Sequence, residues 1–474
     1  MNTVKQLTYL GLSLLLLATW MNPLSAQPTG SVHIQNATVL TISDGDLENT
    51  DVVIEDGIIT EIGQDLSTPS GAEAIDATGK YVMPGIVDAH SHVAISRGVN
   101  EATNPVTAEV SIRDAVDPND VNIYRALAGG VTSAQLKHGS ANVIGGQSAT
   151  VKFRYGESAE TMKYDDAPQL IKFALGENPT RVHGQGRGIK PRTRMGVEQV
   201  VREKFDKALD YRRAREEYLE QKEQSERWFR RGDPPQPVPK NERLEVIADI
   251  IEGEVVVQCH SYRADEIQML MRVFDDYDID NLTFHHIIEG YKVAPELAEH
   301  GYHASSFMDW WSFKVEAFYA TTYNPTIMND YGVLTSIHSD SAEIIRHLNH
   351  EAAKAVKYGG TSKNDALAMI TLNPATQMGI DDQVGSIEEG KHGDVSIWTD
   401  HPLSIYAVNE HTFVDGVEYF NRHEDEDDQR LDVDPETEFQ AGSFIEGRHE
   451  DACIHGQNEE EIFYLFEEGN YRFE

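Results

Sequence analysis

Short apolar runs alternate with longer amphipathic stretches through the middle of the chain. Near-continuous apolar strands separated by helices are typical of a parallel sheet that is covered on both faces. Seven or eight such strands at this length predict an α/β protein, with a TIM-like (β/α)8 barrel over residues 81–380. The expected strands are Ile86–Ala89, Val131–Leu136, Ile171–Leu175, Val255–Cys259, Leu282–His286, His303–Ser306 and Val333–Ile337.

The two flanks of this region carry a different pattern, in which apolar and polar residues alternate over short stretches bounded by turn residues. Period-two alternation is the signature of half-buried strands. We therefore expect residues 27–80 and 381–422 to form one small β-sandwich domain, built from N-terminal and C-terminal strands. The clearest of these strands are Val32–Gln35, Asp51–Ile54, Val395–Trp398 and Thr412–Val417.

A charged stretch interrupts the expected barrel. Its apolar residues, among them Val200, Phe205 and Leu209, recur at helical spacing, and Gly232-Asp233-Pro234-Pro235 ends it. This pattern predicts a solvated helical insertion at residues 197–240.

The N-terminus has the features of a signal peptide. Lys5 supplies a positive charge, Leu7–Met21 is apolar, and Leu24-Ser25-Ala26 offers small residues for cleavage. The apolar run is shorter than the roughly 18 residues that a spanning helix needs. We expect residues 1–26 to be removed and the mature protein to be exported to the periplasm or outside the cell, with no membrane insertion.

Acidic residues outnumber basic residues, 79 to 40, which gives a formal net charge of −39. This excess argues against nucleic acids and anionic membranes as partners, because both require basic patches. It fits either simple solubility or adaptation to high salt, in which screening relieves the repulsion between carboxylates. Residues 423–474 are expected to form an acidic C-terminal extension.

The two cysteines, Cys259 and Cys453, are too few for a disulfide scaffold. Both are expected to be free, with Cys259 packed in the core as a small apolar residue.

The strongest chemical signal is the first barrel strand, which ends in His90-Ser91-His92. Because side chains in a strand alternate with period two, His90 and His92 point to the same face. The carboxyl ends of barrel strands carry the active site, and two imidazoles there make half of a metal site.

Three later strands also end in potential metal ligands, namely His260, His286 and Asp340. A buried carboxylate with no partner costs several kcal/mol, whereas a metal ion stabilises it. Ser339-Asp340-Ser341 is also good helix-capping chemistry, so capping is the alternative role for Asp340.

These motifs resemble the amidohydrolase superfamily of metal-dependent hydrolases, in its imidazolonepropionase-like branch and a secreted subgroup of it. The resemblance runs from about residue 31 to about residue 421. It is carried by Val82-Met83-Pro84-Gly85-Ile86-Val87-Asp88-Ala89-His90-Ser91-His92, by Thr371-Leu372-Asn373-Pro374-Ala375 and by Gly385-Ser386-Ile387-Glu388-Glu389-Gly390-Lys391. The secreted subgroup is indicated by Phe173-Ala174-Leu175-Gly176-Glu177-Asn178-Pro179 and by the glycine-rich stretch from Gly139 to Gln147.

The resemblance implies that His90 and His92 bind one metal ion, that His260 and His286 bind a second, and that Asp340 binds metal and acts as general base. Of the adjacent pair His285 and His286, we expect only His286 to face inward, because the family's His-x-x-Glu spacing fits it.

An anionic group must bridge two metal ions, and two residues are candidates. Lys172 faces the expected barrel axis and would serve after carboxylation by CO₂, whereas Glu177 ends the same strand. A third possibility is that Lys172 pairs with Glu177 and that only one metal ion binds.

Three further residues are candidate substrate contacts. Asn142 lies in the glycine-rich stretch and would bind a substrate carboxylate or amide. The alternative is that this stretch is a plain loop. Arg263 would bind a substrate carboxylate or else pair with a nearby acid, and His338 is either a substrate contact or a core histidine.

The sequence thus predicts an exported enzyme that hydrolyses an amide-type C–N bond with one or two divalent ions, with Zn²⁺ the expected metal. A small-molecule amide such as a dipeptide or N-acyl amino acid is the favoured substrate, and a homo-oligomer is possible. The alternatives are deamination of a cyclic amidine or nucleobase and, from another class, a non-catalytic metal- or ligand-binding protein.

Overall fold

The computed structural model describes residues 27–164, 166–226, 235–423 and 428–431. The expected signal peptide, Cys453 and most of the acidic extension lie outside these residues.

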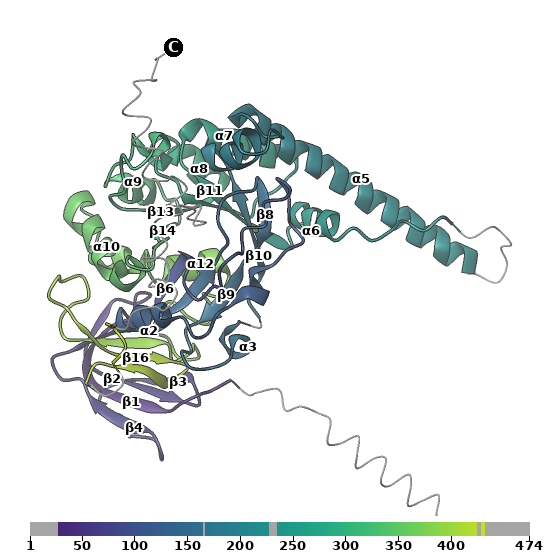
Figure 1. Ribbon diagram of the computed structural model, residues 1–474. Helices are drawn as coiled ribbons and strands as arrows, with labels where there is room; N and C mark the ends of the chain where they lie inside the picture. The colour runs from purple at the N-terminus through teal and green to yellow at the C-terminus, as the bar shows by residue number, and fades with distance from the viewer. Residues whose placement is uncertain (1–26, 165, 227–234, 424–427, 432–474) are drawn as a thin grey trace, which may run out of the picture.

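Two sheets of mostly parallel strands form the middle of the molecule (Figure 1). The larger sheet has the order β14-β13-β12-β11-β10-β8, and the smaller one has the order β6-β7-β9. Each of the seven sequence-predicted strands is present. The bounds are β6 (Ile86–Ser91), β7 (Val131–Leu136), β8 (Ile144–Gln147), β9 (Ala149–Lys152), β10 (Gln169–Ala174), β11 (Val255–Ser261), β12 (Leu282–His286), β13 (His303–Ser306) and β14 (Thr335–Ile337).

Backbone hydrogen bonds join the two sheets at both ends. The consecutive strands β8 and β9 pair antiparallel with β10 and β7 respectively, so this segment belongs to both sheets. At the other end, the N–H of Asp340, after β14, donates to the carbonyl oxygen of His90 in β6 at 3.0 Å. The carboxyl ends of β6 and β14 are therefore held side by side.

The glycine-rich stretch before Gln147, expected as a plain loop, supplies strand β8. Its glycines are required by close approach, because a Cβ atom on Gly145 would lie 2.4 Å from the His138 ring and one on Gly146 would lie 2.7 Å from Val110. Turn formation is not their role.

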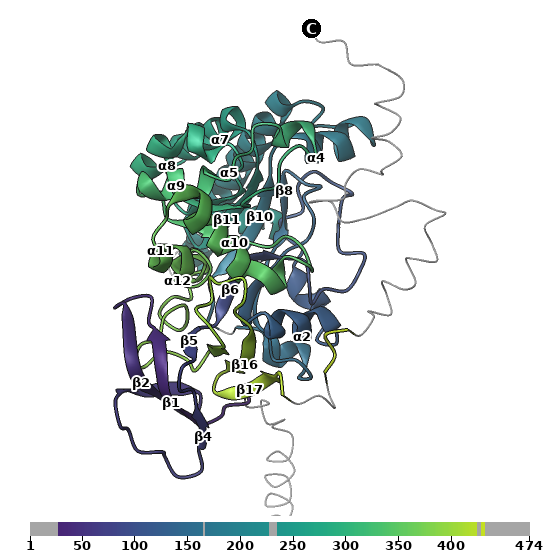
Figure 2. The ribbon, with the colours of Figure 1, turned by 90° about the vertical axis from the view of Figure 1, so that its left-hand side faces the viewer.

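Strands from both ends of the chain form a third, eight-stranded sheet, here called the composite sheet (Figure 2). Its order is β17-β16-β15-β5-β1-β2-β3, with β4 paired to β1, so the predicted union of N-terminal and C-terminal strands is confirmed. The bounds are β1 (Val32–Leu40), β2 (Asp46–Glu55), β3 (Ile58–Gly63), β4 (Glu73–Asp76), β5 (Tyr81–Pro84), β15 (Val395–Trp398), β16 (Asn409–Val414) and β17 (Val417–Asn421).

The predicted charged insertion begins as one long helix, α5 (Arg194–Glu226), followed by α6 (Glu242–Ile251). Its first half is less solvated than expected, because Val197, Val201 and Phe205 are buried in the core. The second half extends away from the rest of the molecule (Figure 1).

Shorter helices connect the strands. They are α2 (Val121–Ala128), α3 (Ala159–Met162), α4 (Glu177–Pro179), α7 (Ala264–Asp276), α8 (Ala294–His300), α9 (Asn324–Asp330), α10 (Leu348–Lys354), α11 (Lys363–Ala368) and α12 (Leu372–Met378). Among the described residues, none of the helices has the length and apolar character needed to cross a membrane.

Candidate metal centre

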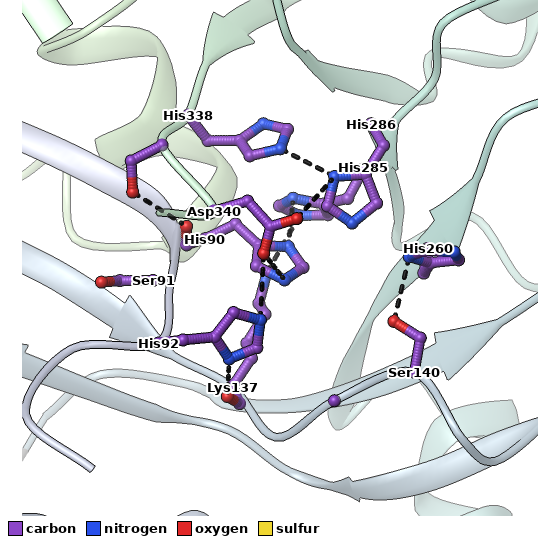
Figure 3. Close-up of polar contacts among 12 residues, drawn as sticks. His90, Ser91, His92, Lys137, Ser140, His260, His285, His286, His338 and Asp340 are labelled. Atoms are coloured by element: carbon purple, nitrogen blue, oxygen red, sulfur yellow. Dashed lines mark hydrogen bonds and ion pairs between the residues drawn. The ribbon is translucent and has the colours of Figure 1, made fainter. Parts of the chain in front are cut away.

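Side chains from the ends of several strands meet at one place (Figure 3). Oδ1 of Asp340 lies 3.0 Å from Nε2 of His92 and 3.6 Å from Nε2 of His90. One ligand atom from each of the three residues falls within 4.8 Å of the other two, a grouping that suits a metal ion. The structure thus brings together the His-x-His pair and the aspartate that were singled out from the sequence.

The orientation of His92 is fixed by the backbone. Its Nδ1 lies 2.6 Å from the carbonyl oxygen of Lys137, and because a carbonyl only accepts, Nδ1 carries the proton. In the neutral ring Nε2 is then the atom that lacks a proton, and it is the nitrogen that faces Asp340. A hydrogen bond of this kind sets the tautomer that a metal-binding histidine needs.

His260 and His286 approach the same place from β11 and β12, with their ring centroids 4.6 Å apart. Nδ1 of His260 lies 3.0 Å from Oγ of Ser140, which follows β7. Nδ1 of His286 lies 2.9 Å from Nε2 of His338 and 3.7 Å from Oδ2 of Asp340. His286 therefore faces inward, as expected, and His260 faces the same place.

The expectation that His285 packs outward is wrong. Its Nδ1 lies 3.3 Å from Nδ1 of His90, and its Nε2 lies 3.1 Å from Nζ of Lys137. The reason is a break in the strand alternation, since His286 has a left-handed backbone with φ of 66°. Two consecutive side chains can then face the same interior, which strand periodicity alone does not allow.

Lys172 and Glu177, the two candidate bridging residues, are placed differently. Nζ of Lys172 lies 3.1 Å from Nε2 of His90 and donates to the carbonyl oxygen of His138 at 2.7 Å. Oε1 of Glu177 instead lies 3.9 Å from Nζ of Lys314, outside the group of histidines. The reason is that Glu177 begins α4 after Gly176, whose φ of 79° turns the chain away from β10.

The predicted substrate role of Asn142 is not supported by its contacts. Its Nδ2 donates to the carbonyl oxygen of Glu101 and to Oγ1 of Thr107, both at 2.7 Å, and its Oδ1 lies 3.0 Å from Nε2 of His183. The side chain is buried and its hydrogen-bonding groups hold the surrounding loops together.

Arg263 pairs with Asp265 at 3.0 Å, so the alternative that it binds a nearby acid is the one observed. The pKa of its guanidinium is raised, first by that hydrogen bond. His338 is buried, with its Nε2 near His286 and its Nδ1 2.8 Å from Oγ of Ser305. It is therefore a neighbour of the expected metal ligands.

Sequence reasoning missed Lys137, which is fully buried beside these residues. Its Nζ donates to the carbonyl oxygen of Ala89 at 2.8 Å and lies 3.4 Å from Oε1 of Gln258. The signal was available, because Lys137 directly follows an apolar strand just as His260 and His286 end theirs.

A buried carboxylate, that of Asp88, joins β6 to the end of β14 and so positions His90 and Asp340. These two residues, with His92, His260 and His286, are called the cluster below. Its Oδ1 accepts from the backbone N–H of Ser339 at 3.0 Å, and its Oδ2 accepts from Oγ of Ser339 at 2.5 Å. Burial raises the pKa of Asp88 to about 6, against the lowering effect of these hydrogen bonds. The contact fixes Asp340 next to His90.

The cluster has the electrostatic properties of a cation site. Burial holds the pKa of His90, His260 and His286 well below the ordinary histidine value, so their imidazoles are neutral. Three buried atoms make no hydrogen bond to any described residue. They are the two carboxylate oxygens of Asp340 and Nε2 of His286. A divalent metal ion would satisfy these atoms, so the residues fit such an ion.

Aromatic rings cover the cluster on one side. Tyr262 and Phe307 each lie nearly parallel to His286, with centroids 5.5 Å and 4.9 Å away, and Trp310 stacks on Phe307 at 4.6 Å. Such a covering lowers the local dielectric and strengthens every electrostatic interaction inside.

Comparisons with known proteins find similarity to amidohydrolases. Residues 316–418 match the model of the Amidohydrolase family. A crystal structure of an amidohydrolase from Thermotoga maritima MSB8 is 33% identical, covers 82% of this chain and 100% of that chain, and superposes with a TM-score of 0.74.

Curated proteins give partial matches. Amidohydrolase tasK of Hapsidospora irregularis is 28% identical over 397 residues, which are 78% of this chain but only 40% of the relative. The 5'-deoxyadenosine deaminase of Methanosarcina acetivorans is 52% identical over 68 residues, which are 14% of this chain and 15% of that enzyme. The chain therefore spans less than half the length of these curated relatives.

Proposed function

The chain belongs to the amidohydrolase family, and from that membership we propose that it is a metal-dependent enzyme that hydrolyses an amide-type C–N bond. The observation that carries the proposal is the carboxylate of Asp340, which is buried among His90, His92 and His286 and makes no hydrogen bond to the described residues. A structural carboxylate would be expected to have hydrogen-bond donors.

In this proposal His90, His92 and Asp340 hold one divalent ion, with zinc the expected metal. His260 and His286 would hold a second ion, and Lys172, once carboxylated, would supply an anionic ligand. When bound, such ions provide Lewis acidity and lower the pKa of a coordinated water molecule toward neutrality.

The chain's own residues carry the proton transfers. Asp340 accepts the proton of the attacking water and returns it to the leaving nitrogen as the C–N bond breaks. Its position is held by Asp88 through Ser339, so its oxygens stay aimed at the histidines. The rings of Tyr262, Phe307 and Trp310 limit the access of bulk water to this side of the cluster.

The favoured substrate is a small peptide-like amide, such as a dipeptide or N-acyl amino acid. Export, which we propose from the N-terminal sequence, makes breakdown of a cytosolic metabolite a poorer fit. Deamination is the second candidate, and the local similarity to a deaminase favours keeping it in the test. Release of ammonia instead of an amino acid separates the two reactions.

We extend the proposal to the architecture. The joined strands β6 to β14 are taken as a (β/α)8 barrel in which the segment β8–β9 is antiparallel to its neighbours, and the composite sheet as a sandwich around the apolar core of Ile34, Val52 and Ile397. The proposed parts are a signal peptide at 1–26, a composite domain at 27–80 and 381–422, a barrel at 81–380 with the insertion 197–240, and an acidic extension at 423–474. The barrel boundary at residue 81 is too early, because β5 (Tyr81–Pro84) pairs with β1 and β15 in the composite sheet.

The test is metal analysis of the purified protein, combined with product analysis on a library of dipeptides and N-acyl amino acids. We expect one or two equivalents of a divalent metal and release of free amino acids that stops when a chelator removes the metal. Metal-free protein with undiminished hydrolysis would contradict the proposal.

A further inference from the structure

A second group of metal-binding residues lies on the composite sheet, away from the candidate metal centre. Glu410 and His411 are neighbours in β16, and His423 follows β17, the edge strand of that sheet. One ligand atom from each residue lies within 4.8 Å of the other two. Glu410 and His411 are buried and His423 is exposed, so the group opens to solvent on one side.

Two of these three side chains, those of Glu410 and His411, are held in place by a further partner. Nδ1 of His411 lies 2.6 Å from Oε1 of Glu418, which fixes the ring and directs its other nitrogen away from that carboxylate. The carboxylate–histidine arrangement is the one that orients histidine ligands in metal sites. One oxygen of Glu410 pairs with Lys80 at 2.7 Å, while the other lies 3.3 Å from Nε2 of His423.

The backbone around His423 is also fixed. Its N–H donates to Oδ1 of Asn421 at 3.0 Å, and Nε of Arg422 donates to the carbonyl oxygen of Asn409 at 2.6 Å. These bonds hold the residues after β17 against β16. His423 is therefore already placed beside Glu410, and metal binding would not have to order this part of the backbone.

A comparison with another acidic group explains why this one is chosen. His392, Asp394 and Asp415 are also close together, but the ammonium of Lys152 lies within 2.8 Å of all three and already neutralises them. Among the described residues, Lys80 is the lysine or arginine that pairs with Glu410, and it pairs with Oε2, whereas Oε1 is the oxygen that lies near His423.

We propose that Glu410, His411 and His423 bind a divalent transition-metal ion of the zinc type, and that the ion braces the edge strand β17 against β16. Two imidazoles and one carboxylate suit Zn²⁺, Ni²⁺ or Cu²⁺ and disfavour Ca²⁺ and Mg²⁺, which take oxygen ligands. The large negative charge of the chain raises the local concentration of cations. This site is independent of the proposed hydrolysis.

The experiment measures zinc binding to the tag-free full chain after chelator treatment, by equilibrium dialysis and isothermal titration with ZnCl₂. His423→Ala should bind one equivalent less than the wild type and keep the wild-type turnover. Glu418→Gln should weaken binding at this site by about 10–100-fold, as loss of an orienting carboxylate does. His300→Ala is the matched control, because His300 lies at the same 3.3 Å from Asp275 but forms no metal-binding group with a second histidine among the described residues.

Zinc should also raise the unfolding temperature of the wild type more than that of His423→Ala. Equal zinc uptake by the wild type and His423→Ala would overturn the proposal. An equal loss in His300→Ala would do so too, because binding would then be nonspecific attraction to surface histidines.

Discussion

Nζ of Lys172 in β10 lies 3.1 Å from Nε2 of His90 in β6, and both side chains are buried. An ammonium group beside neutral histidines in a buried site is costly unless other groups compensate its charge. Loss of a proton from the ammonium, attack of the free amine on CO₂ and loss of a second proton would replace the positive charge with a carbamate anion. The contact therefore favours Lys172 over Glu177 as the bridging residue of a two-metal site.

The first prediction separates Lys172 from Glu177. Lys172→Ala should bind one metal ion fewer than the wild type, because its carbamate is no longer there to hold the second ion. Glu177→Ala, the matched control, should keep the full metal content, since its carboxylate points to Lys314. Metal analysis of both variants decides, and retention of both ions in Lys172→Ala would remove the bridged site from the account.

The strand pattern was the most predictable feature of the fold. Each apolar run between helices became a strand, because a buried parallel strand must be apolar on both faces. The antiparallel segment β8–β9 was not predicted, since Gly145 and Gly146 serve close packing and look like turn residues in the sequence.

The placement of the expected ligands at strand ends was also predictable, because the period of a strand and its carboxyl end determine where His90, His92 and His260 point. The left-handed backbone at His286 and at Asp340 (φ of 49°) was not predictable, and the backbone at His286 is what turns His285 inward. The hydrogen-bond partners of a side chain could not be predicted either. The side-chain amide of Asn142, for example, bonds to Glu101, Thr107 and His183.

The second prediction concerns pH. Burial raises the pKa of Glu266 to about 8, with repulsion from Glu316 as the next cause, whereas the ordinary value is 4.5. The folded protein then binds this proton more tightly than the unfolded chain does, so this group makes stability fall as pH rises from 4.5 toward 8.

Glu266→Gln should remove this loss of folding stability at higher pH. Relative to the wild type, its free energy of unfolding should rise by at least about 1.4 kcal/mol, the value of one pKa unit, between pH 5 and pH 8. Urea unfolding at both pH values measures it, with the exposed Glu254→Gln as control. A difference from the wild type that is the same at pH 5 and pH 8 would show that Glu266 does not titrate as stated.

The third prediction concerns salt. With 79 acidic and 40 basic residues, repulsion between carboxylates should destabilise the fold at low ionic strength. The unfolding temperature should therefore rise as sodium chloride increases to molar concentration, while an equal osmolality of sucrose serves as the uncharged control. A flat or falling temperature in salt would favour simple solubility as the role of the acidic surface.

The central claim is that Asp340 is the proton acceptor, and its geometry disfavours the alternative of helix capping. Oγ of Ser341, and not the carboxylate of Asp340, accepts from the N–H groups of Glu343 and Ile344, at 3.2 Å and 3.4 Å. Asparagine tolerates the left-handed backbone found at residue 340, so Asp340→Asn should fold normally.

The most direct test is the turnover of Asp340→Asn on any substrate that the wild type hydrolyses, with the unfolding temperature measured in parallel. We expect a loss of at least about 10²–10⁴-fold in kcat, because the amide cannot accept the proton. The control Asp265→Asn, which alters a carboxylate paired with Arg263, should keep its activity. Near-native turnover by a folded Asp340→Asn protein would contradict the account.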